Sequence, residues 1–205
     1  MKRTLIFFLL FTFLQPSFSQ KKFFKNYKFT EADTLRGMLR PERTCYDVTF
    51  YNLQIKVDIE KKYISGYNEI YYRAVDDFTK IQIDLFDNLK INKILFKGKK
   101  LSFTRKFNAV FIDFPKQKKG TKNSFIVHYE GAPISAKNPP WDGGFVWRKN
   151  SNGDPWVAVS CEGIGASLWF PNKDHLYDEP DSIRIGVAVP NGLTCISNGN
   201  LENTQ

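Results

Sequence analysis

Two histidines and three cysteines are the side chains of this sequence best suited to metal binding or nucleophilic chemistry. The histidines, His128 and His175, lie far apart in the chain, and so do Cys45, Cys161 and Cys195. Structural and catalytic zinc sites usually show ligand pairs only a few residues apart. No such spacing occurs here, so the sequence predicts no metal site and no catalytic residue within these 205 residues.

His175 has the more suggestive neighbours, because Asp174 and Asp178 stand close to it. Such a group can bind a metal ion or transfer a proton. A single histidine beside carboxylates is, however, more often a hydrogen-bonding group at the surface. We therefore interpret these three residues as holding a loop together.

Four tryptophans form a second set of conspicuous side chains. Large amphipathic rings can stack on sugars, but they fill cores and interfaces equally well, and we favour the packing role. These residues are Trp141, Trp147, Trp156 and Trp169.

The beginning of the chain predicts export. Two basic residues precede an apolar run from Leu5 to Leu14, and a small-x-small pattern ends at Ser19. This is the arrangement of a secretory signal peptide, and the run is shorter than the roughly 20 residues that span a membrane. We expect residues 1–19 to be removed, leaving Gln20 first, and the protein to reach the periplasm or the extracellular space without a membrane span.

Export would bring the three cysteines into an oxidising compartment. One disulfide and one free thiol could then form. The sequence does not select the pair.

The charge balance is basic, with 30 Lys and Arg against 21 Asp and Glu, a formal charge of +9. Clusters lie at residues 97–100 and 116–119, where turns are expected. A basic excess can attract nucleic acid, but lysines at turns also prevent strand edges from pairing. Because export separates the chain from most nucleic acid, we interpret the lysines as solvated turns and expect no nucleic-acid partner.

The elements that must position these side chains are strands. Apolar residues alternate with polar ones between Val48 and Leu201, and no ten-residue segment has helical spacing. Leu53, Ile55 and Val57 illustrate a strand with one buried face. Further strands are expected at 64–73, 81–85, 91–96, 109–114, 124–129, 145–147, 156–160, 182–189 and 193–197, with Phe103 beginning a hairpin. The short connections predict an all-β, mostly antiparallel sandwich, with residues 20–44 as an N-terminal extension and 45–205 as one domain.

Two long segments interrupt this pattern. Residues 131–154 are rich in Pro, Gly and Asn, and residues 161–180 combine glycines, a tryptophan and several acids. Long ordered loops in an otherwise economical β-domain often carry function.

Three stretches resemble the N-terminal domain of the aminopeptidase N family of gluzincin zinc metallopeptidases, in particular its secreted bacterial members. The first joins ADTLRG (32–37) and PERT (41–44) to the strand that follows, and the second joins residues 81–91 to 125–131. The third is the most specific, with SCEGIGAS at 160–167, WFPNKDH at 169–175 and DEPD at 178–181. The resemblance covers essentially the whole chain after the expected signal peptide, in order, and ends with SNGNL at 197–201.

The resemblance implies a saddle-like antiparallel β-sandwich that leans on a thermolysin-like catalytic domain. By the same resemblance, Glu162 holds the α-amine of a peptide substrate, and the backbone near Cys161 and Gly163 shapes the first specificity pocket. A carboxylate facing a protonated amine forms a charge-assisted hydrogen bond, which fixes the distance from the peptide N-terminus to the bond that is cut. The implied activity is removal of N-terminal residues from peptides.

The sequence departs from the family in one respect. The zinc-binding H-E-x-x-H helix and the G-x-M-E-N motif do not occur in these 205 residues. We therefore expect a chain truncated before the catalytic domain, inactive alone, with zinc as a cofactor only of the full-length enzyme. The alternative is a stand-alone exported β-sandwich that binds a ligand or partner through its tryptophan-rich loops.

Overall fold

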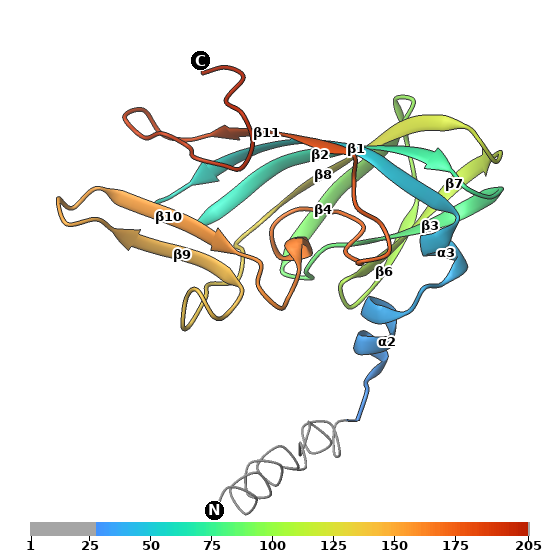
Figure 1. The fold of residues 1–205 in the computed structure, drawn as a ribbon, viewed down its shortest axis with the longest axis horizontal. Coiled ribbons are helices and arrows are strands. Elements are labelled where there is room, and N and C mark those ends of the chain that lie inside the picture. The colour runs from blue at the N-terminus through green and yellow to red at the C-terminus, as the bar shows by residue number, and fades with distance from the viewer. Residues whose placement is uncertain (1–27, 205) are drawn as a thin grey trace, which may run out of the picture. The chain divides into compact units, whose positions relative to one another are not determined.

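A computed structural model describes residues 28–204, and Figure 1 shows its fold. The segment Glu31–Gln205 is a compact unit, whereas the expected signal peptide lies outside the described residues. In chain order the elements are α2 (Glu31–Gly37), α3 (Pro41–Thr44), β1 (Tyr46–Asp58), β2 (Tyr63–Ala74), β3 (Phe78–Asp84), β4 (Leu89–Phe96), β5 (Lys99–Lys100), β6 (Phe103–Lys106), β7 (Ala109–Gln117), β8 (Lys122–Gly131), β9 (Gly144–Lys149), β10 (Pro155–Ser160), a 3₁₀ turn (Ala166–Leu168) and β11 (Ser182–Ala188).

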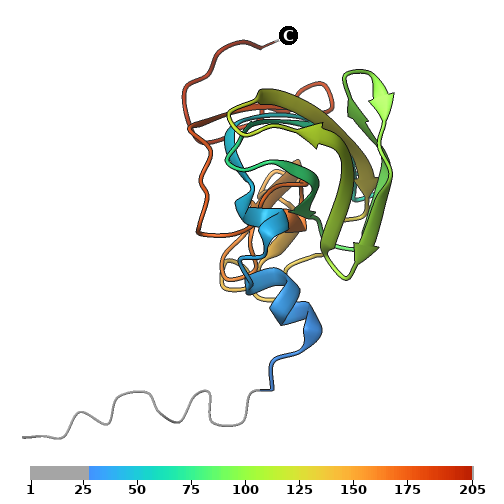
Figure 2. The same ribbon diagram turned by 90° about the vertical axis from the view of Figure 1, so that its right-hand side faces the viewer.

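The strands form two sheets and a separate hairpin. The larger sheet has the order β11-β1-β2-β8-β4-β5, the smaller one has the order β3-β7-β6, and β9 pairs with β10. Figure 2 shows the strands curving around the interior. This architecture confirms the predicted all-β, sandwich-like fold, and the hairpins β1–β2, β6–β7 and β9–β10 confirm the short connections read from the sequence.

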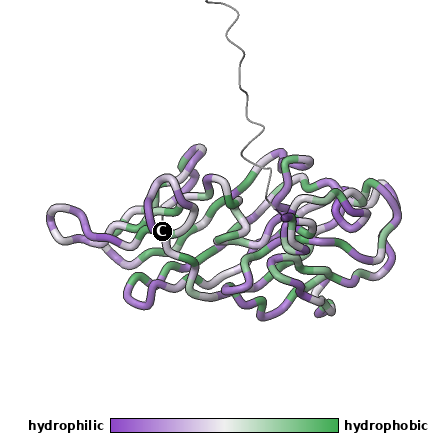
Figure 3. Tube along the Cα trace, turned by 90° about the horizontal axis from the view of Figure 1, so that it is seen from below, coloured by the Kyte–Doolittle hydropathy of each residue, from purple (hydrophilic) through white to green (hydrophobic). Residues whose placement is uncertain are grey.

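The alternating pattern of β1 places its apolar side chains in the core. Leu53, Ile55 and Val57 are buried, as the period of two predicts. Hydrophilic stretches lie at several of the projecting turns of the trace, between apolar stretches (Figure 3).

An aromatic cluster joins the two sheets. The ring of Tyr72 on β2 lies 5.8 Å from that of Phe78 on β3, 6.2 Å from that of Phe114 on β7 and 6.0 Å from that of Phe125 on β8, measured between centroids. Tilted and edge-to-face pairs at such distances are attractive beyond the area they bury. The cluster therefore fixes one sheet against the other.

Gly66 on β2 allows a close approach of backbones. A Cβ atom at this position would lie 2.0 Å from the carbonyl oxygen of Gln54 on β1. A glycine inside a strand often marks a bulge, and we interpreted Gly66 in the sequence in that way. The interpretation was wrong, because the register shift of this strand pair lies between Val48 and Phe50 and the glycine serves close strand contact.

The last strand pairs differently from the others. β11 lies parallel to β1, and all the chain from β2 to β10 lies between the two strands, which is ample length for the crossover that a parallel pair needs. Leu193 N donates to Pro190 O at 3.2 Å, which closes a turn after β11. Residues 193–197 form no strand, however, and the predicted return strand there was wrong.

The two short helices belong to the same compact unit as the strands. Arg43 of α3 is fully buried, and its Nη2 donates to Asp84 Oδ1 at 2.8 Å and to the carbonyl of Leu35 at 3.0 Å. Gln82 Nε2 donates to that same carbonyl at 2.9 Å. Gln82 and Asp84 alternate with apolar residues, yet both are buried, because α3 packs on that face of β3.

Breaking the buried ion pair on one side should strongly destabilise the domain. Arg43→Met leaves the Asp84 carboxylate buried without its cation, which typically costs about 3–5 kcal/mol. The exposed pair between Arg73 and Asp47, 3.0 Å long, is the matched control, because Arg73→Met should cost at most about 1 kcal/mol. Urea denaturation of the purified full chain measures both, and equal effects of the two substitutions would contradict the assigned role.

Candidate functional site

The loop that carries Glu162 follows β10 directly and closes as a tight turn. Ile164 N and Gly165 N both donate to the carbonyl of Cys161, at 3.3 and 3.0 Å. Gly163 has φ 71°, a left-handed conformation that glycine adopts without strain. Glu162 is exposed at the tip of this turn, so its carboxylate projects from a defined backbone.

Two contacts fix the turn to neighbouring segments. Arg36 of α2 donates from Nη2 to the carbonyl of Gly163 at 3.2 Å. On the other side, a Cβ atom at Gly143 would lie 2.1 Å from Cγ1 of Ile164, so Ile164 packs directly on the backbone before β9. The loop is therefore held by both an N-terminal helix and the β9–β10 hairpin.

Gly165 connects the loop to the acidic residue Asp174. A Cβ atom at Gly165 would lie 2.1 Å from Asp174 Oδ2. The same oxygen accepts hydrogen bonds from Ser167 Oγ at 2.5 Å and from Ser167 N at 3.3 Å. Asp174 N in turn donates to Asp84 Oδ2 at 3.2 Å, which links the loop to the buried pair beneath it.

The segment after the 3₁₀ turn is attached to the large sheet by side chains of several strands. Asn68 on β2 donates to the carbonyl of Pro171 at 2.8 Å, and Tyr129 on β8 donates to that of Trp169 at 2.9 Å. Asp84 and Asn172 form an isolated β-bridge. The WFPNKDH segment thus connects the Glu162 loop to the strands of both sheets.

Lys173 of the same segment forms a second buried ion pair with Asp178, and 2.5 Å separates Lys173 Nζ from Asp178 Oδ2. Lys173 Nζ also donates to the backbone carbonyl of Tyr46 at 2.6 Å and lies 4.3 Å from the centre of the Tyr46 ring. Burial lowers the pKa of Lys173, and Asp178 opposes the shift. Asp178 Oδ2 accepts a further bond from Val48 N at 3.1 Å, so the pair fastens the segment to β1.

His175 has a structural role, as expected from the sequence. Its Nδ1 accepts a hydrogen bond from Tyr177 N at 2.9 Å, and its Nε2 lies 3.1 Å from the carbonyl oxygen of Gly37. A ring nitrogen that accepts requires the other to donate in the neutral form. Both nitrogens of His175 are therefore engaged with backbone.

The described residues do not fit the zinc ion that the resemblance implies. Within residues 28–204, no group of three His, Cys, Asp or Glu side chains could hold a metal ion. The three cysteines are free thiols, so the possible disulfide is not formed. Burial raises the pKa of the Cys161 thiol, which disfavours the nucleophilic thiolate. Across the described part of the chain, no helix is long and apolar enough to cross a membrane.

The tryptophans divide into two pairs. Trp147 stacks on Phe145 at 5.2 Å, and Trp169 packs edge-on against Phe170 at 4.9 Å. Trp141 and Trp156 are exposed, by 82% and 59%. The predicted packing role holds for the first pair only.

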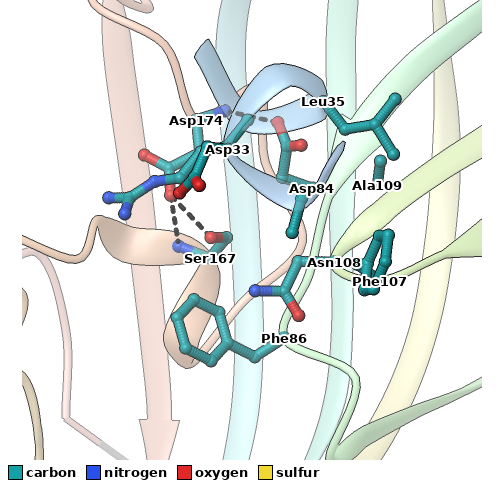
Figure 4. Close-up of a pocket in the computed structure, with 11 residues that line it drawn as sticks. Asp33, Leu35, Asp84, Phe86, Phe107, Asn108, Ala109, Ser167 and Asp174 are labelled. Atoms are coloured by element: carbon teal, nitrogen blue, oxygen red, sulfur yellow. Dashed lines mark hydrogen bonds between the residues drawn. The ribbon is translucent and has the colours of Figure 1, made fainter. Parts of the chain in front are cut away.

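A pocket of about 190 Å³ lies beside the Glu162 loop. It is bounded by α2, the end of β3, the β6–β7 turn and the 3₁₀ turn (Figure 4). The pocket was not predictable from the sequence, because its lining comes from segments that lie far apart in the chain. Arg36, which both lines the pocket and binds the Glu162 loop, is part of the resembling ADTLRG stretch.

Solved structures of similar fold place the chain among known architectures. An M1 zinc metallopeptidase from Deinococcus radiodurans matches with a TM-score of 0.58 and 20% identity, over 72% of this chain and 33% of its own. The fold is that of one part of an M1 zinc metallopeptidase. Leukotriene A4 hydrolase from Saccharomyces cerevisiae matches with a TM-score of 0.56 and 16% identity, over 71% of this chain and 23% of its own.

These likenesses agree with the resemblance read from the sequence, which pointed to the N-terminal domain of such enzymes. The chain spans about a third or less of the length of these structures. No protein-family model matches the chain, and no curated protein matches its sequence. The roles of Glu162, Cys161 and Gly163 in substrate binding stay predictions.

The two glycines of the loop should respond differently to a methyl group. Both glycines have a positive φ, so each substitution adds backbone strain of about 1–2 kcal/mol. Gly165→Ala also forces the Asp174 carboxylate away from Ser167, whereas Gly163→Ala meets no atom within 4 Å. We expect Gly165→Ala to accelerate hydrogen exchange of the Ile164 and Gly165 amides well beyond the effect of Gly163→Ala. Equal exchange rates in the two variants would show that Asp174 does not hold the loop.

Proposed function

We propose that this chain is the N-terminal β-domain of a secreted zinc aminopeptidase and that Glu162 binds the α-amine of the peptide substrate. The observation that carries the proposal is the position of Glu162 in the M1-like fold, exposed on a turn that is fixed from both sides. The LTA4 hydrolase and Deinococcus matches support the fold context.

The geometry suits an anchoring role. Because the Cys161 carbonyl accepts two bonds and the Gly163 carbonyl accepts one, the backbone on both sides of Glu162 is already ordered before a ligand arrives. An ordered backbone at this position reduces the conformational freedom that is lost when the side chain binds an ammonium group. Cys161 and Gly163 would shape the surface next to the first substrate residue through this ordered backbone.

The chain's own contribution is limited to binding and orientation. Zinc in such enzymes polarises the scissile carbonyl and lowers the pKa of a bound water, and the described residues offer no site for it. The proposed partners are therefore a peptide N-terminus and a thermolysin-like catalytic domain. Reading the coding sequence beyond Gln205 tests this part, and an H-E-x-x-H motif is the expected finding.

Peptide binding to the purified full chain tests the anchor. The peptide Tyr-Ser-Ala, named as the substrate in one of the similar M1 structures, should shift the NMR signals of residues 161–165, and its N-acetylated form should not. Glu162→Gln should weaken binding about two- to fivefold, as for an exposed ion pair of roughly 0.5–1 kcal/mol. Glu179→Gln, at another exposed acid, is the control. Equal binding of both peptides would refute the anchoring role.

A stand-alone binding module is the second candidate. Exposed apolar side chains are compatible with either candidate, because they can contact a ligand or a missing domain. Trp141, Leu176 and Tyr177 are exposed by 82%, 96% and 54%. In a domain that leans on a catalytic partner such residues form an interface, and the dye ANS should bind the purified full chain strongly there. Weak ANS binding together with glycan binding in the presence of EDTA would favour the stand-alone module.

A further inference from the structure

The outer face of the large sheet carries aromatic rings in contact with water. This face consists of the side chains that alternate with the buried ones along β1, β2 and β8. On it, Tyr67 of β2 lies 5.5 Å from His128 of β8, measured between ring centroids. Tyr71 of β2, which is 36% exposed, lies 5.4 Å from Phe50 of β1. The two aromatic pairs are about 13 Å apart along β2, because each residue of a strand advances roughly 3.3 Å.

Polar side chains occupy the row between the two aromatic pairs. In the register of the sheet, Asn52 of β1 lies opposite Glu69 of β2. Glu69 Oε1 accepts a hydrogen bond from Ser124 Oγ at 2.8 Å, and Asn52 Oδ1 accepts one from Gln54 Nε2 at 2.8 Å. The amide groups of Asn52 and Gln54 have capacity for further hydrogen bonds. An apolar surface would leave these groups unsatisfied, whereas the hydroxyl groups of a sugar would bond to them.

The end of the face at the first aromatic pair has an excess of positive charge. Lys93 of β4 lies opposite His128, and the neighbouring row contains Lys56, Lys90 and the acid Glu130. Burial and the nearby Lys93 lower the pKa of His128, so its ring is uncharged at neutral pH. Three lysines against one carboxylate attract an anionic ligand to this end.

The outer face points away from the Glu162 loop. Asn68 and Tyr129, which bind the segment after the 3₁₀ turn, lie on the buried side of β2 and β8. Figure 1 shows the segment between β10 and β11 on that side of the large sheet. A ligand on the outer face would therefore leave the surroundings of Glu162 open.

We propose that the outer face of the large sheet binds an acidic polysaccharide. Sugar rings pack on the two aromatic pairs, the polar row between them bonds to hydroxyl groups, and carboxylate or sulfate groups pair with Lys56 and Lys93. A chain of several sugars is needed to contact both pairs across about 13 Å. This inference goes beyond the proposed peptidase role and does not depend on it, because it concerns the opposite side of the sheet.

Calorimetry with four polymers tests the chemistry of the face on the purified full chain. Alginate, a polymer of uronic acids, or dextran sulfate should bind at least about tenfold more tightly than two controls, and comparing the two identifies the preferred anion. Neutral dextran has sugar rings without charge, and poly-L-glutamate has charge without sugar rings. Equal binding of either control would overturn the proposal. Absence of binding to both acidic polysaccharides, with or without binding to phosphatidylglycerol vesicles, would overturn it as well.

Aromatic substitutions locate the site. Tyr67→Thr keeps a residue suited to a strand but removes the ring, so it should weaken polysaccharide binding about two- to tenfold. Tyr67→Phe keeps the ring and should bind nearly as tightly as the unsubstituted chain. Trp156→Thr on β10 is the matched control, because that ring is 59% exposed outside the large sheet. Equal effects of Tyr67→Thr and Trp156→Thr would contradict the assignment.

A charge substitution and NMR complete the test. Lys93→Gln should weaken binding about two- to fivefold and reduce its dependence on salt, whereas Lys149→Gln at the exposed end of β9 should not. The polysaccharide should shift the NMR signals of Tyr67 and His128 and leave those of residues 161–165 unchanged. Shifts confined to residues 161–165 would refute the proposal. Loss of peptide binding at Glu162 leaves the outer-face signals unaffected, so the two functions can fail separately.

Discussion

The buried contact between Arg43 and Asp84 is the interaction on which the rest of the structure depends. Both side chains are almost completely inaccessible, and a charge in such surroundings is tolerable only with a partner and further hydrogen bonds. Burial raises the pKa of Asp84 above its ordinary value, and the guanidinium of Arg43 and the amide of Gln82 oppose this shift only in part. Satisfying this one carboxylate therefore brings α3, β3 and the segment after the 3₁₀ turn to a single point.

The position of Glu162 follows from that point through a short series of contacts. The Asp84 carboxylate accepts a hydrogen bond from the backbone N–H of Asp174. The Asp174 carboxylate in turn accepts a hydrogen bond from Ser167 and leaves room only for glycine at position 165. Gly165 closes the turn whose tip is Glu162. The backbone position of the exposed Glu162 thus depends on a buried ion pair. This dependence explains why side chains of the large sheet bind the 166–178 segment.

The strands were predictable from sequence because a period of two is a local signal. Leu53, Ile55 and Val57 alternate with polar residues and are buried as expected. The same rule does not predict the burial of Asp84, because the helix that supplies its cation lies about forty residues earlier in the chain. It also suggested a return strand at 193–197, because a turn motif does not tell whether β1 already occupies the neighbouring edge. The pocket could not be predicted from the sequence for the same reason, since its lining residues come together only after folding.

Solvent exposure sets a limit on what Glu162 can do in this chain alone. An ion pair between exposed groups contributes little, typically about 0–1 kcal/mol, because water competes for both charges and salt screens them. The same carboxylate becomes far more effective when a second surface excludes water from it, as the lower effective dielectric strengthens the interaction. Exposed Trp141, Leu176 and Tyr177 are the kind of apolar surface that could be covered in such a contact. On these physical grounds, the proposed amine anchor at Glu162 would gain selectivity mainly when a second surface covers the loop.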